Sequence, residues 1–410
     1  MKKGLICLFC LFISLPVFHI NVQANEDFPT LRSHNAIVIH RNDDRVMYEK
    51  NSDEKIYPAS MTKIMTTLVA IENIKDIKQT YTFKNDFFIT LQEQNASVAG
   101  FENGQVLTME DLLYGILLPS GADATLAIAD ALFGSEAKFV EKMNEKSVAL
   151  NLNNTHFVNT SGLHDEKHYS TVKDIAKLLT YALQNETFKT IFTTDRYTTS
   201  DGQLTLYSTL ATQEHLLSQD TSMIQGAKTG FTNEASLCLA SLAQEGEEQY
   251  IMVSAQSNSN SSYPYHIEDA AKIYEYLFDQ YERKIVAKKG DTLKKLKLSS
   301  QEDKKYSVKS TKDISVLMKK GSTLKVKWDG LTEIETPEYS DTFLGSYLVY
   351  EDDQLISSQD YYLEYNLEAS TSLSDGGNLI AFIKENSFFL ICIITFGASF
   401  FFSYNRTKKK

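Results

Sequence analysis

Residues 60–74 read SMTKIMTTLVAIENI, and their pattern decides how the surrounding sequence is interpreted. Apolar residues recur at three- and four-residue spacing, which is typical of a helix that packs on a core. Residues three positions apart lie on one side of a helix, so the amine of Lys63 can lie beside the hydroxyl of Ser60. An amine with a lowered pKa can take the proton of that hydroxyl and make it nucleophilic. A plainer alternative is a serine that caps a helix, with an exposed lysine one turn later.

The flanking sequence predicts an α+β domain over residues 25–282. Helix-period tracts cover residues 109–132, 136–150 and 171–183, and a closing amphipathic helix covers residues 266–281. Short β-type runs lie on either side of the helical tracts, at residues 36–40, 45–50, 223–228, 236–243 and 250–256. The first two runs flank a four-residue polar turn and predict a hairpin. This order indicates an antiparallel sheet with helices packed on it and a helical subdomain.

Beyond Arg283 the pattern changes to period-two alternation, which predicts a small all-β domain over residues 283–370. Residues 283–330 contain 15 basic and 5 acidic residues, whereas the later segments are acidic. Two explanations remain open. Oppositely charged strands could pair with one another, or a basic face could rest on anionic lipid headgroups.

The N-terminal residues 1–24 have the pattern of a signal peptide. Lys2 and Lys3 precede an apolar run, and Val22-Gln23-Ala24 ends in the small residue that a signal peptidase prefers. We therefore expect cleavage after Ala24 and export of the rest of the chain. The alternative is an uncleaved N-terminal membrane anchor.

The C-terminal end predicts a membrane anchor. Residues 387–404 carry no charge and precede a basic tail over residues 405–410, which is the pattern of a transmembrane helix with a cytoplasmic end. Residues 371–386 serve as a linker. A cleaved wall-sorting signal is the alternative, although no Leu-Pro-x-Thr-Gly sequence precedes the apolar run. We expect a cell-membrane protein with a single C-terminal span and its main domain outside the cytoplasm.

The composition excludes several classes of function. The chain of 410 residues has 41 basic and 53 acidic residues, so its net charge of −12 lacks the basic footprint of a nucleic-acid-binding protein. Of the four cysteines, only Cys238 lies in the expected exported body, which excludes an intrachain disulfide there and predicts a buried core thiol. The histidines show no metal-ligand spacing, so no metal is expected.

Two further motifs carry candidate chemistry. Lys228-Thr229-Gly230 lies in the run QGAKTGFT, and a strand with these residues can present an ammonium, a hydroxyl and an open backbone edge to a peptide that ends in a carboxylate. It lacks the glycine spacing of a phosphate-binding loop. Residues 119–124, PSGADA, interrupt a helical tract where Ser120 could relay a proton. Taken singly, the first motif is also compatible with an edge strand before a turn, and the second with a loop serine.

In the order S-x-x-K, S-G-x-D-A and K-T-G, the three motifs resemble those of the serine penicillin-recognising enzymes. The surrounding residues look like those of the D-alanyl-D-alanine carboxypeptidase family of low-molecular-mass penicillin-binding proteins, namely residues 35–67, 111–130, 154–171 and 226–232. The resemblance covers roughly residues 36–281, and the β-domain with a C-terminal membrane attachment is also similar to that family. It implies a β-lactamase/transpeptidase-like fold.

The resemblance also implies an activity. The protein would remove the terminal D-alanine from peptidoglycan stem pentapeptides, and β-lactam antibiotics would be covalent inhibitors. Ser60 would be acylated, Lys63 would be its general base, and Ser120 would pass the proton to the leaving D-alanine. Water would then hydrolyse the acyl-enzyme, with no metal or cofactor.

Substrate binding follows from the same resemblance. Lys228 and Thr229 would hold the terminal carboxylate of the substrate, beside Gly230. Backbone N–H groups of Ser60 and Phe231 would form the oxyanion hole, which stabilises the charge of the tetrahedral intermediate.

Two positions depart from the family pattern. Ala122 stands where the family usually has the asparagine of Ser-x-Asn, whose amide would donate to the substrate backbone and help orient the lysine. Because the loss of one such hydrogen bond costs ~1–3 kcal/mol, we expect slower or altered turnover. His266 is the nearest counterpart of an arginine that contributes to carboxylate binding in many members.

Two other functions remain open. The position of Ala122 is compatible with a cell-wall binding or scaffolding protein that reacts with penicillin yet hardly turns over peptide. A β-lactamase would share the three motifs, but it would be a compact soluble domain with an efficient deacylating glutamate. The added β-domain and the expected span argue against it.

Overall fold

The structure, a computed structural model, describes residues 28–84, 91, 95–257, 263–299, 301–335 and 342–363. The expected signal peptide, linker, transmembrane helix and basic tail all lie outside these residues. Among the helices of the described ranges, none is long and apolar enough to cross a membrane. The chain divides into two compact units between Gln280 and Tyr281.

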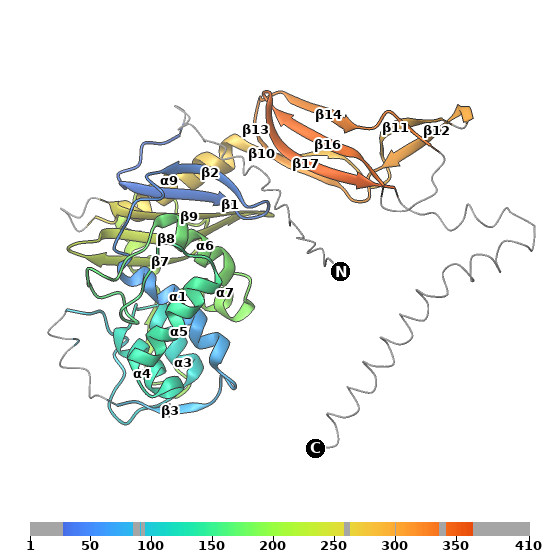
Figure 1. Cartoon of the computed structure of the whole chain (residues 1–410). Helices are drawn as coiled ribbons and strands as arrows, with labels where there is room; N and C mark the ends of the chain where they lie inside the picture. Colours follow the sequence, from blue (N-terminus) through green and yellow to red (C-terminus); the bar gives the residue numbers. More distant parts are fainter. Residues whose placement is uncertain are drawn as a thin grey trace, which may run out of the picture. The chain divides into compact units, whose positions relative to one another are not determined.

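A five-stranded antiparallel sheet forms the centre of the first unit (Figure 1). Its strands, from one edge to the other, are β2 (Arg45–Lys50), β1 (Asn35–His40), β9 (Glu248–Ser257), β8 (Ser236–Glu245) and β7 (Ile224–Thr232). The predicted hairpin and antiparallel sheet are thus confirmed. β7 continues beyond the predicted end at residue 228, so the Lys-Thr-Gly motif lies inside an edge strand. Cys238 of β8 is buried, as predicted, and burial raises the pKa of its thiol to about 12.

Helices pack on the sheet and form a separate helical layer. They are α1 (Thr62–Asn73), α3 (Met109–Leu117), α4 (Ala122–Phe133), α5 (Glu136–Ala149), α6 (Val172–Ala182), α7 (Glu186–Phe192), α8 (Thr209–Gln213) and α9 (Tyr265–Gln280). Two 3-10 turns are η1 (Ala59–Met61) and η2 (Glu214–Leu216), and two short hairpins pair β3 (Thr80–Thr82) with β4 (Val106–Thr108) and β5 (Arg196–Thr198) with β6 (Thr205–Tyr207). The Ser120 turn splits the predicted tract at residues 109–132 into α3 and α4. The short helices α7 and α8 were not predicted, because so few residues give no clear periodicity.

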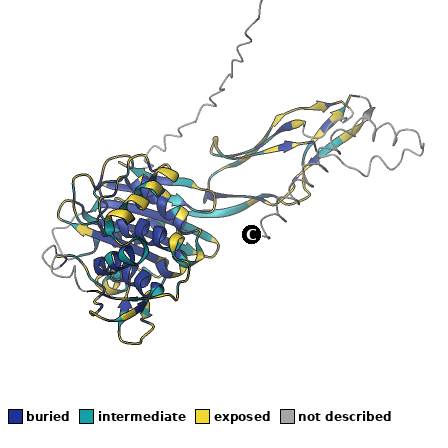
Figure 2. Cartoon of the chain, turned by 60° about the horizontal axis from the view of Figure 1, so that its bottom comes forward, coloured by how far each residue is buried: buried dark blue, intermediate teal, exposed yellow. Residues whose placement is uncertain are grey.

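The central helix of this unit is α1. Every residue from Thr62 to Ala70 is buried, including Ile64, Met65 and Leu68. A helix that is buried on all sides lies inside a core, and Figure 2 shows the concentration of buried residues in this unit. Lys63 is therefore carried into the protein interior by its position on α1.

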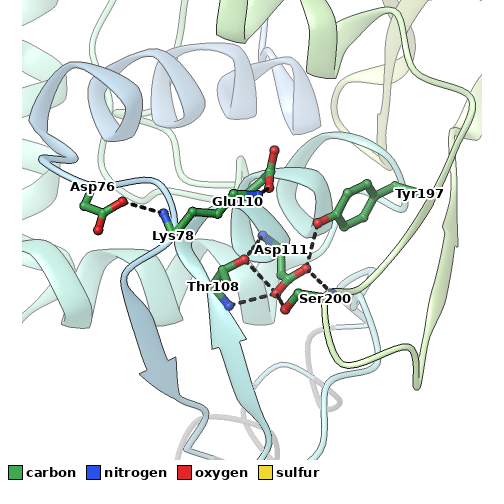
Figure 3. A network of polar contacts seen from close by, with 7 residues as sticks. All are labelled: Asp76, Lys78, Thr108, Glu110, Asp111, Tyr197 and Ser200. Atoms are coloured by element: carbon green, nitrogen blue, oxygen red, sulfur yellow. Dashed lines mark hydrogen bonds and ion pairs between the residues drawn. The ribbon is translucent and has the colours of Figure 1, made fainter.

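The start of α3 is fixed by a buried carboxylate (Figure 3). Asp111 and Thr108 form a capping box, in which Thr108 Oγ1 accepts from the Asp111 N–H at 3.1 Å and the carboxylate accepts from the Thr108 N–H at 2.8 Å. The same carboxylate accepts hydrogen bonds from the Ser200 N–H and the Tyr197 hydroxyl, each at 2.8 Å. These contacts hold the residues around β5 against α3, the helix that leads into the Ser120 turn.

The second unit is built from strands throughout its described residues. They form β10 (Tyr281–Ala287) with β13 (Ile314–Lys319), β12 (Gln301–Lys309) with β11 (Thr292–Leu298) and β15 (Glu333–Ile334), and β14 (Leu324–Gly330) with β16 (Phe343–Glu351) and β17 (Gln354–Tyr362). Its core includes Leu296, Val308, Leu344 and Val349.

The charges of the second unit pair only in part as the sequence suggested. Lys325 of β14 forms an ion pair with Asp353 at 2.6 Å, and Lys297 of β11 lies opposite Glu333 in a parallel register. On its other side, however, β11 pairs along its length with the lysine-rich β12, where Lys297 lies opposite Lys305. The expected pairing of basic strands with acidic strands is therefore wrong for the β11–β12 pair, because these two strands are neighbours in sequence and form a hairpin.

Candidate active site

Ser60 and Lys63 meet at the N-terminal end of α1. Ser60 lies in η1, and the Nζ atom of Lys63 lies 3.1 Å from Ser60 Oγ. The same Nζ donates to the carbonyl oxygen of Ser161 at 2.7 Å. Lys63 is only 2% exposed, and it lines the cavity beside Ser60.

Burial sets the protonation of this lysine. Desolvation lowers the pKa of Lys63 to about 7, and the negative charge of Asp123 opposes the shift. Near neutral pH a substantial fraction of the amine is therefore unprotonated. An unprotonated amine can accept the Ser60 hydroxyl proton while it keeps one N–H bond to Ser161.

Side chains of α1 also hold the segment over residues 158–168 in place. Thr66 Oγ1 donates to the Thr160 carbonyl at 2.6 Å. His168 Nδ1 accepts from the Val158 N–H at 3.2 Å, so its Nε2 carries the proton and donates to Thr62 Oγ1 at 2.8 Å. Burial lowers the pKa of His168 to about 4, which keeps the ring neutral. This segment supplies the carbonyl that orients Lys63.

Glycine permits close approach at two places around Ser60. Gly162 has φ +86°, and a Cβ there would lie 1.8 Å from the Ala59 carbonyl oxygen. A Cβ at Gly230 would lie 2.9 Å from the backbone nitrogen of Ser60. Residues 162 and 230 can therefore pack directly against the Ser60 turn only because they lack side chains.

β7 places the Lys-Thr-Gly motif beside this turn. Lys228 is fully buried, and its Nζ donates to the Thr229 carbonyl at 2.8 Å. Burial and the charge of Lys63 lower its pKa. Thr229 Oγ1 donates to Thr209 Oγ1 at 2.8 Å. Phe231 differs from these residues, because it is 53% exposed.

Ser120 lies in a strained turn between α3 and α4. Its φ of +64° is rare for a residue with a side chain and costs roughly 1–3 kcal/mol. Its Oγ is buried and has no hydrogen-bond partner among the described residues. A buried hydroxyl without a partner is unusual and calls for an explanation, which an incoming substrate group would provide.

The remainder of this turn is fixed by Asp123. Its carboxylate accepts from the backbone N–H groups of Ala99 at 2.7 Å and Gly100 at 3.1 Å. The Ala122 N–H donates to the Ser97 carbonyl at 2.7 Å. Ala122 therefore keeps the backbone geometry of the turn but offers no side-chain donor.

A cavity of about 310 Å³ opens over Ser60 and Lys63. Its lining consists of Ser60, Lys63, Asn95, Ala96, Ser97, Ala122, Ser161, Gly162, Leu163, His164, Phe231, Thr232, Asn233 and Glu234. Three of the predicted site residues thus share its surface. The other four, which are Ser120, Lys228, Thr229 and Gly230, are not part of that lining. Within the described ranges, no group of three or more His, Cys, Asp or Glu side chains is placed to hold a metal ion.

His266 lies in the first turn of α9 and is buried. Burial, with a smaller effect of the charge of Lys228, lowers its pKa to about 3. Its Nδ1 has no hydrogen-bond partner among the described residues. The expected counterpart of the family arginine is therefore a neutral ring near Lys228 with one free nitrogen.

Sequence reasoning missed four residues that hold the site together. They are Ser161, His168, Asp123 and Thr209. Asp123, Ser161 and His168 belong to stretches that carry the family resemblance, but their contacts run to residues distant in sequence. A single sequence gives no signal for such contacts.

The fold, the buried Ser-Lys pair and the neighbouring Lys-Thr-Gly strand define a serine hydrolase of the α+β transpeptidase-like class. The structure resembles penicillin binding protein 5 from Haemophilus influenzae with a TM-score of 0.65, at 22% identity over 82% of this chain and 98% of that chain, which supports the fold. It also resembles the Streptomyces K15 DD-transpeptidase, with a TM-score of 0.55 and 30% identity over 62% of this chain and 99% of that chain.

Sequence comparison then identifies the family. Residues 21–259 match the family model for peptidase S11, D-alanyl-D-alanine carboxypeptidase. The D-alanyl-D-alanine carboxypeptidase DacF of Bacillus subtilis is 34% identical over 300 residues, which are 70% of this chain and 73% of that protein. The D-alanyl-D-alanine carboxypeptidase of Streptomyces sp. K15 is 32% identical over 61% of this chain and 88% of its own length. The chain belongs to the S11 family and is a serine D-alanyl-D-alanine carboxypeptidase that acts on peptidoglycan.

Proposed function

We propose that this carboxypeptidase works through an acyl-enzyme on Ser60, with Lys63 as the general base. The observation that carries the proposal is the 3.1 Å contact between Lys63 Nζ and Ser60 Oγ, made by an amine whose burial lowers its pKa to about 7. A base with a pKa near the working pH transfers protons most efficiently. The neutral amine takes the hydroxyl proton as Ser60 Oγ attacks the carbonyl carbon between the two D-alanines of a stem pentapeptide.

The remaining groups complete the reaction. Backbone N–H groups of Ser60 and Phe231 stabilise the oxyanion of the tetrahedral intermediate. Ser120 gives its hydroxyl proton to the departing D-alanine nitrogen as the C–N bond breaks, and it receives in turn the proton that Lys63 took from Ser60; its unpaired Oγ is available for this relay. Water then attacks the ester, and the Ser60 hydroxyl re-forms as the shortened peptide leaves. β-lactams enter the same route and remain attached when deacylation is slow.

The C-terminal carboxylate of the substrate is bound by Lys228 and Thr229. Without substrate, burial and Lys63 keep the pKa of Lys228 low. A bound carboxylate favours the charged ammonium, because opposite charges in a buried site attract strongly. A peptide blocked as its C-terminal amide lacks this charge and would bind poorly.

The experiment measures D-alanine release from a D-Ala-D-Ala pentapeptide and labelling by a fluorescent penicillin. Ser60→Ala should abolish both, while Ser218→Ala, at an exposed serine outside the site, should abolish neither. The rate of penicillin acylation should rise with pH through about 7, because only the unprotonated form of Lys63 can accept the proton. Release of D-alanine by Ser60→Ala would refute the proposed nucleophile.

A second candidate, a penicillin-binding protein with slow peptide turnover, is favoured by Ala122. Fluorescent penicillin would still label Ser60 in that case, so labelling does not distinguish the two. The two candidates differ in the number of D-alanine molecules released per enzyme. A protein with slow deacylation would release about one molecule and then remain as the acyl-enzyme.

We also propose that the enzyme acts outside the cell membrane, attached by residues 387–404. The support is the uncharged run followed by the basic residues Arg406, Lys408, Lys409 and Lys410. Removal of residues 387–410 should move the protein from the membrane fraction to the soluble exported fraction.

A further inference from the structure

The mouth of the cavity carries a charge that the proposed chemistry does not use. The ionisable side chains in the lining are Lys63, His164 and Glu234. Lys63 is buried and serves as the base, whereas His164 and Glu234 are 28% and 44% exposed. His164 Nδ1 lies 3.9 Å from Glu234 Oε2, which is beyond hydrogen-bond distance. In the described part of the chain, the Glu234 carboxylate has no hydrogen bond.

The course of the bound peptide follows from the proposed function. The terminal carboxylate lies at Lys228 and Thr229, and the reacting carbonyl lies at Ser60 and Phe231. The C-terminal end of the substrate therefore lies beside residues 228 and 229 of β7, and its preceding residues lie toward residue 232. The substrate is thus antiparallel to β7, an edge strand that pairs with β8 on one side only (Figure 1). Such an edge can accept an added strand.

Strand geometry then places the preceding residue of the substrate. Each residue advances about 3.3 Å along a strand. With the terminal D-alanine beside Thr229 and the second D-alanine beside Gly230 and Phe231, the residue before them lies beside Thr232 and Asn233. Glu234 follows immediately after this point and shares the cavity lining with both.

The position of Glu234 suits a cation. The neighbouring His164 is held in place, because its ring packs edge-on against Tyr57 with centroids 4.6 Å apart. The Glu234 carboxylate therefore has one neighbour, 3.9 Å away, and its side chain remains 44% exposed at the cavity lining. A flexible side chain that ends in an ammonium can reach it and form a charge-assisted hydrogen bond.

We infer that Glu234 forms a specificity subsite for an ammonium-bearing side chain on the residue that precedes the two D-alanines. The inference rests on the proposed function, because the direction of the peptide comes from the Ser60 and Lys228 assignments. The subsite discriminates between a charged and a neutral side chain at that position. It adds a substrate preference and leaves the chemical step to Ser60 and Lys63.

The test compares two peptides that differ only in this charge. One carries lysine and the other Nε-acetyl-lysine before D-Ala-D-Ala, and D-alanine release gives kcat/KM for each. A third peptide with meso-diaminopimelate distinguishes a free ammonium from one that is joined to a second carboxylate. The enzymes are the wild type, Glu234→Gln and the matched control Glu275→Gln, which changes an exposed glutamate on α9 outside the cavity lining.

We expect the wild type and Glu275→Gln to prefer lysine over acetyl-lysine by about two- to tenfold, the range of a partly exposed ion pair. In Glu234→Gln the ratio should fall to about one. A wild-type kcat/KM ratio of one for the two peptides, or a preference for lysine that survives Glu234→Gln, would overturn the inference. In either case, D-alanine release from both peptides would still support the proposed function. No release from either peptide would refute the proposed function, and the inference with it.

Discussion

The two sides of the active site differ in how their polar groups are satisfied. On the base side, formed by the first turn of α1 and residues 158–168, Lys63 is bonded to Ser161 and His168 is bonded at both nitrogens. On the relay side, formed by residues 119–123, the Ser120 hydroxyl has no partner among the described residues and Ala122 has no polar side chain. In the proposed mechanism, the base is therefore preorganised before substrate arrives, whereas the relay side would be completed by the substrate.

The two sides therefore differ in the free energy that their polar groups cost the folded protein before substrate binds. Preorganised groups need no rearrangement during the reaction, which is where an enzyme gains most of its electrostatic stabilisation. An unpaired buried hydroxyl instead costs about 1–3 kcal/mol until a partner binds. Changes on the base side should therefore affect acylation and stability together, while changes on the relay side should affect turnover most.

Among the changes that test this comparison between the two sides, the largest effect is expected from Gly162→Ala, which disturbs the base side. The new Cβ would lie 1.8 Å from the Ala59 carbonyl oxygen, so the segment that carries Ser161 must move away from Ser60 and Lys63. A displacement of about 1 Å at a reacting group can cost ~10²-fold in rate. We expect a loss of that order in penicillin acylation, together with a lower melting temperature.

Gly134→Ala is the matched control for this change. Gly134 has φ +74°, close to the +86° of Gly162, but a Cβ there meets nothing within 4 Å. The control therefore reproduces the backbone strain, about 1–2 kcal/mol, without the clash. Equal acylation rates in the two variants would show that the close packing of residue 162 on the Ser60 turn does not matter for the base side.

A smaller effect is expected for His168, which is neutral in the folded protein. Its pKa is lowered from 6.5 to about 4 by burial, so between these values the unfolded chain binds more protons than the folded one. Stability is therefore lost as the pH falls from about 6.5 toward 4, by about 3 kcal/mol in total from this group. His168→Gln keeps a donor for Thr62 but cannot titrate, so its stability should fall less over this range.

Urea unfolding at pH 7 and pH 4.5 measures this difference. His215→Gln, which changes an exposed histidine of η2, is the control for loss of a histidine as such. If His168 is held neutral in the folded protein, the wild type and His215→Gln should lose stability in parallel, and His168→Gln should lose less than either. Parallel curves for all three proteins would show that His168 is not held neutral by its two hydrogen bonds.

The two sides also differ in how far the sequence could predict them. The approach of Lys63 to Ser60 was predictable because it depends on a three-residue spacing within one helix. The contacts of Lys63 with Ser161 and of Thr62 with His168 join residues 98 and 106 positions apart, and no local pattern encodes them. The left-handed backbone of Ser120 was not predictable either, since the surrounding packing imposes it.

The sheet shows the same division between local and long-range information. The hairpin of β1 and β2 follows from alternation and a polar turn, and the structure confirms it. The continuation of β7 through Gly230 to Thr232 depends on its pairing with β8. In the second unit, composition suggested that basic strands face acidic ones, but the register of β11 and β12 is set by chain connection and places lysines opposite each other.

The smallest effect is expected from Ala122→Asn, which sharpens the comparison by adding a donor to the relay side. Ala122 lines the cavity, and its N–H is already bonded to the Ser97 carbonyl, so the added amide can point toward the substrate without a change of backbone. One new hydrogen bond of about 1 kcal/mol should raise kcat/KM for a D-Ala-D-Ala peptide about fivefold. Ala137→Asn, the same substitution at an exposed position of α5, should leave the rate unchanged. If Ala122→Asn also left kcat/KM unchanged, the missing amide would not limit turnover. The unpaired hydroxyl of Ser120 would then be the only feature of the relay side that the substrate has to satisfy.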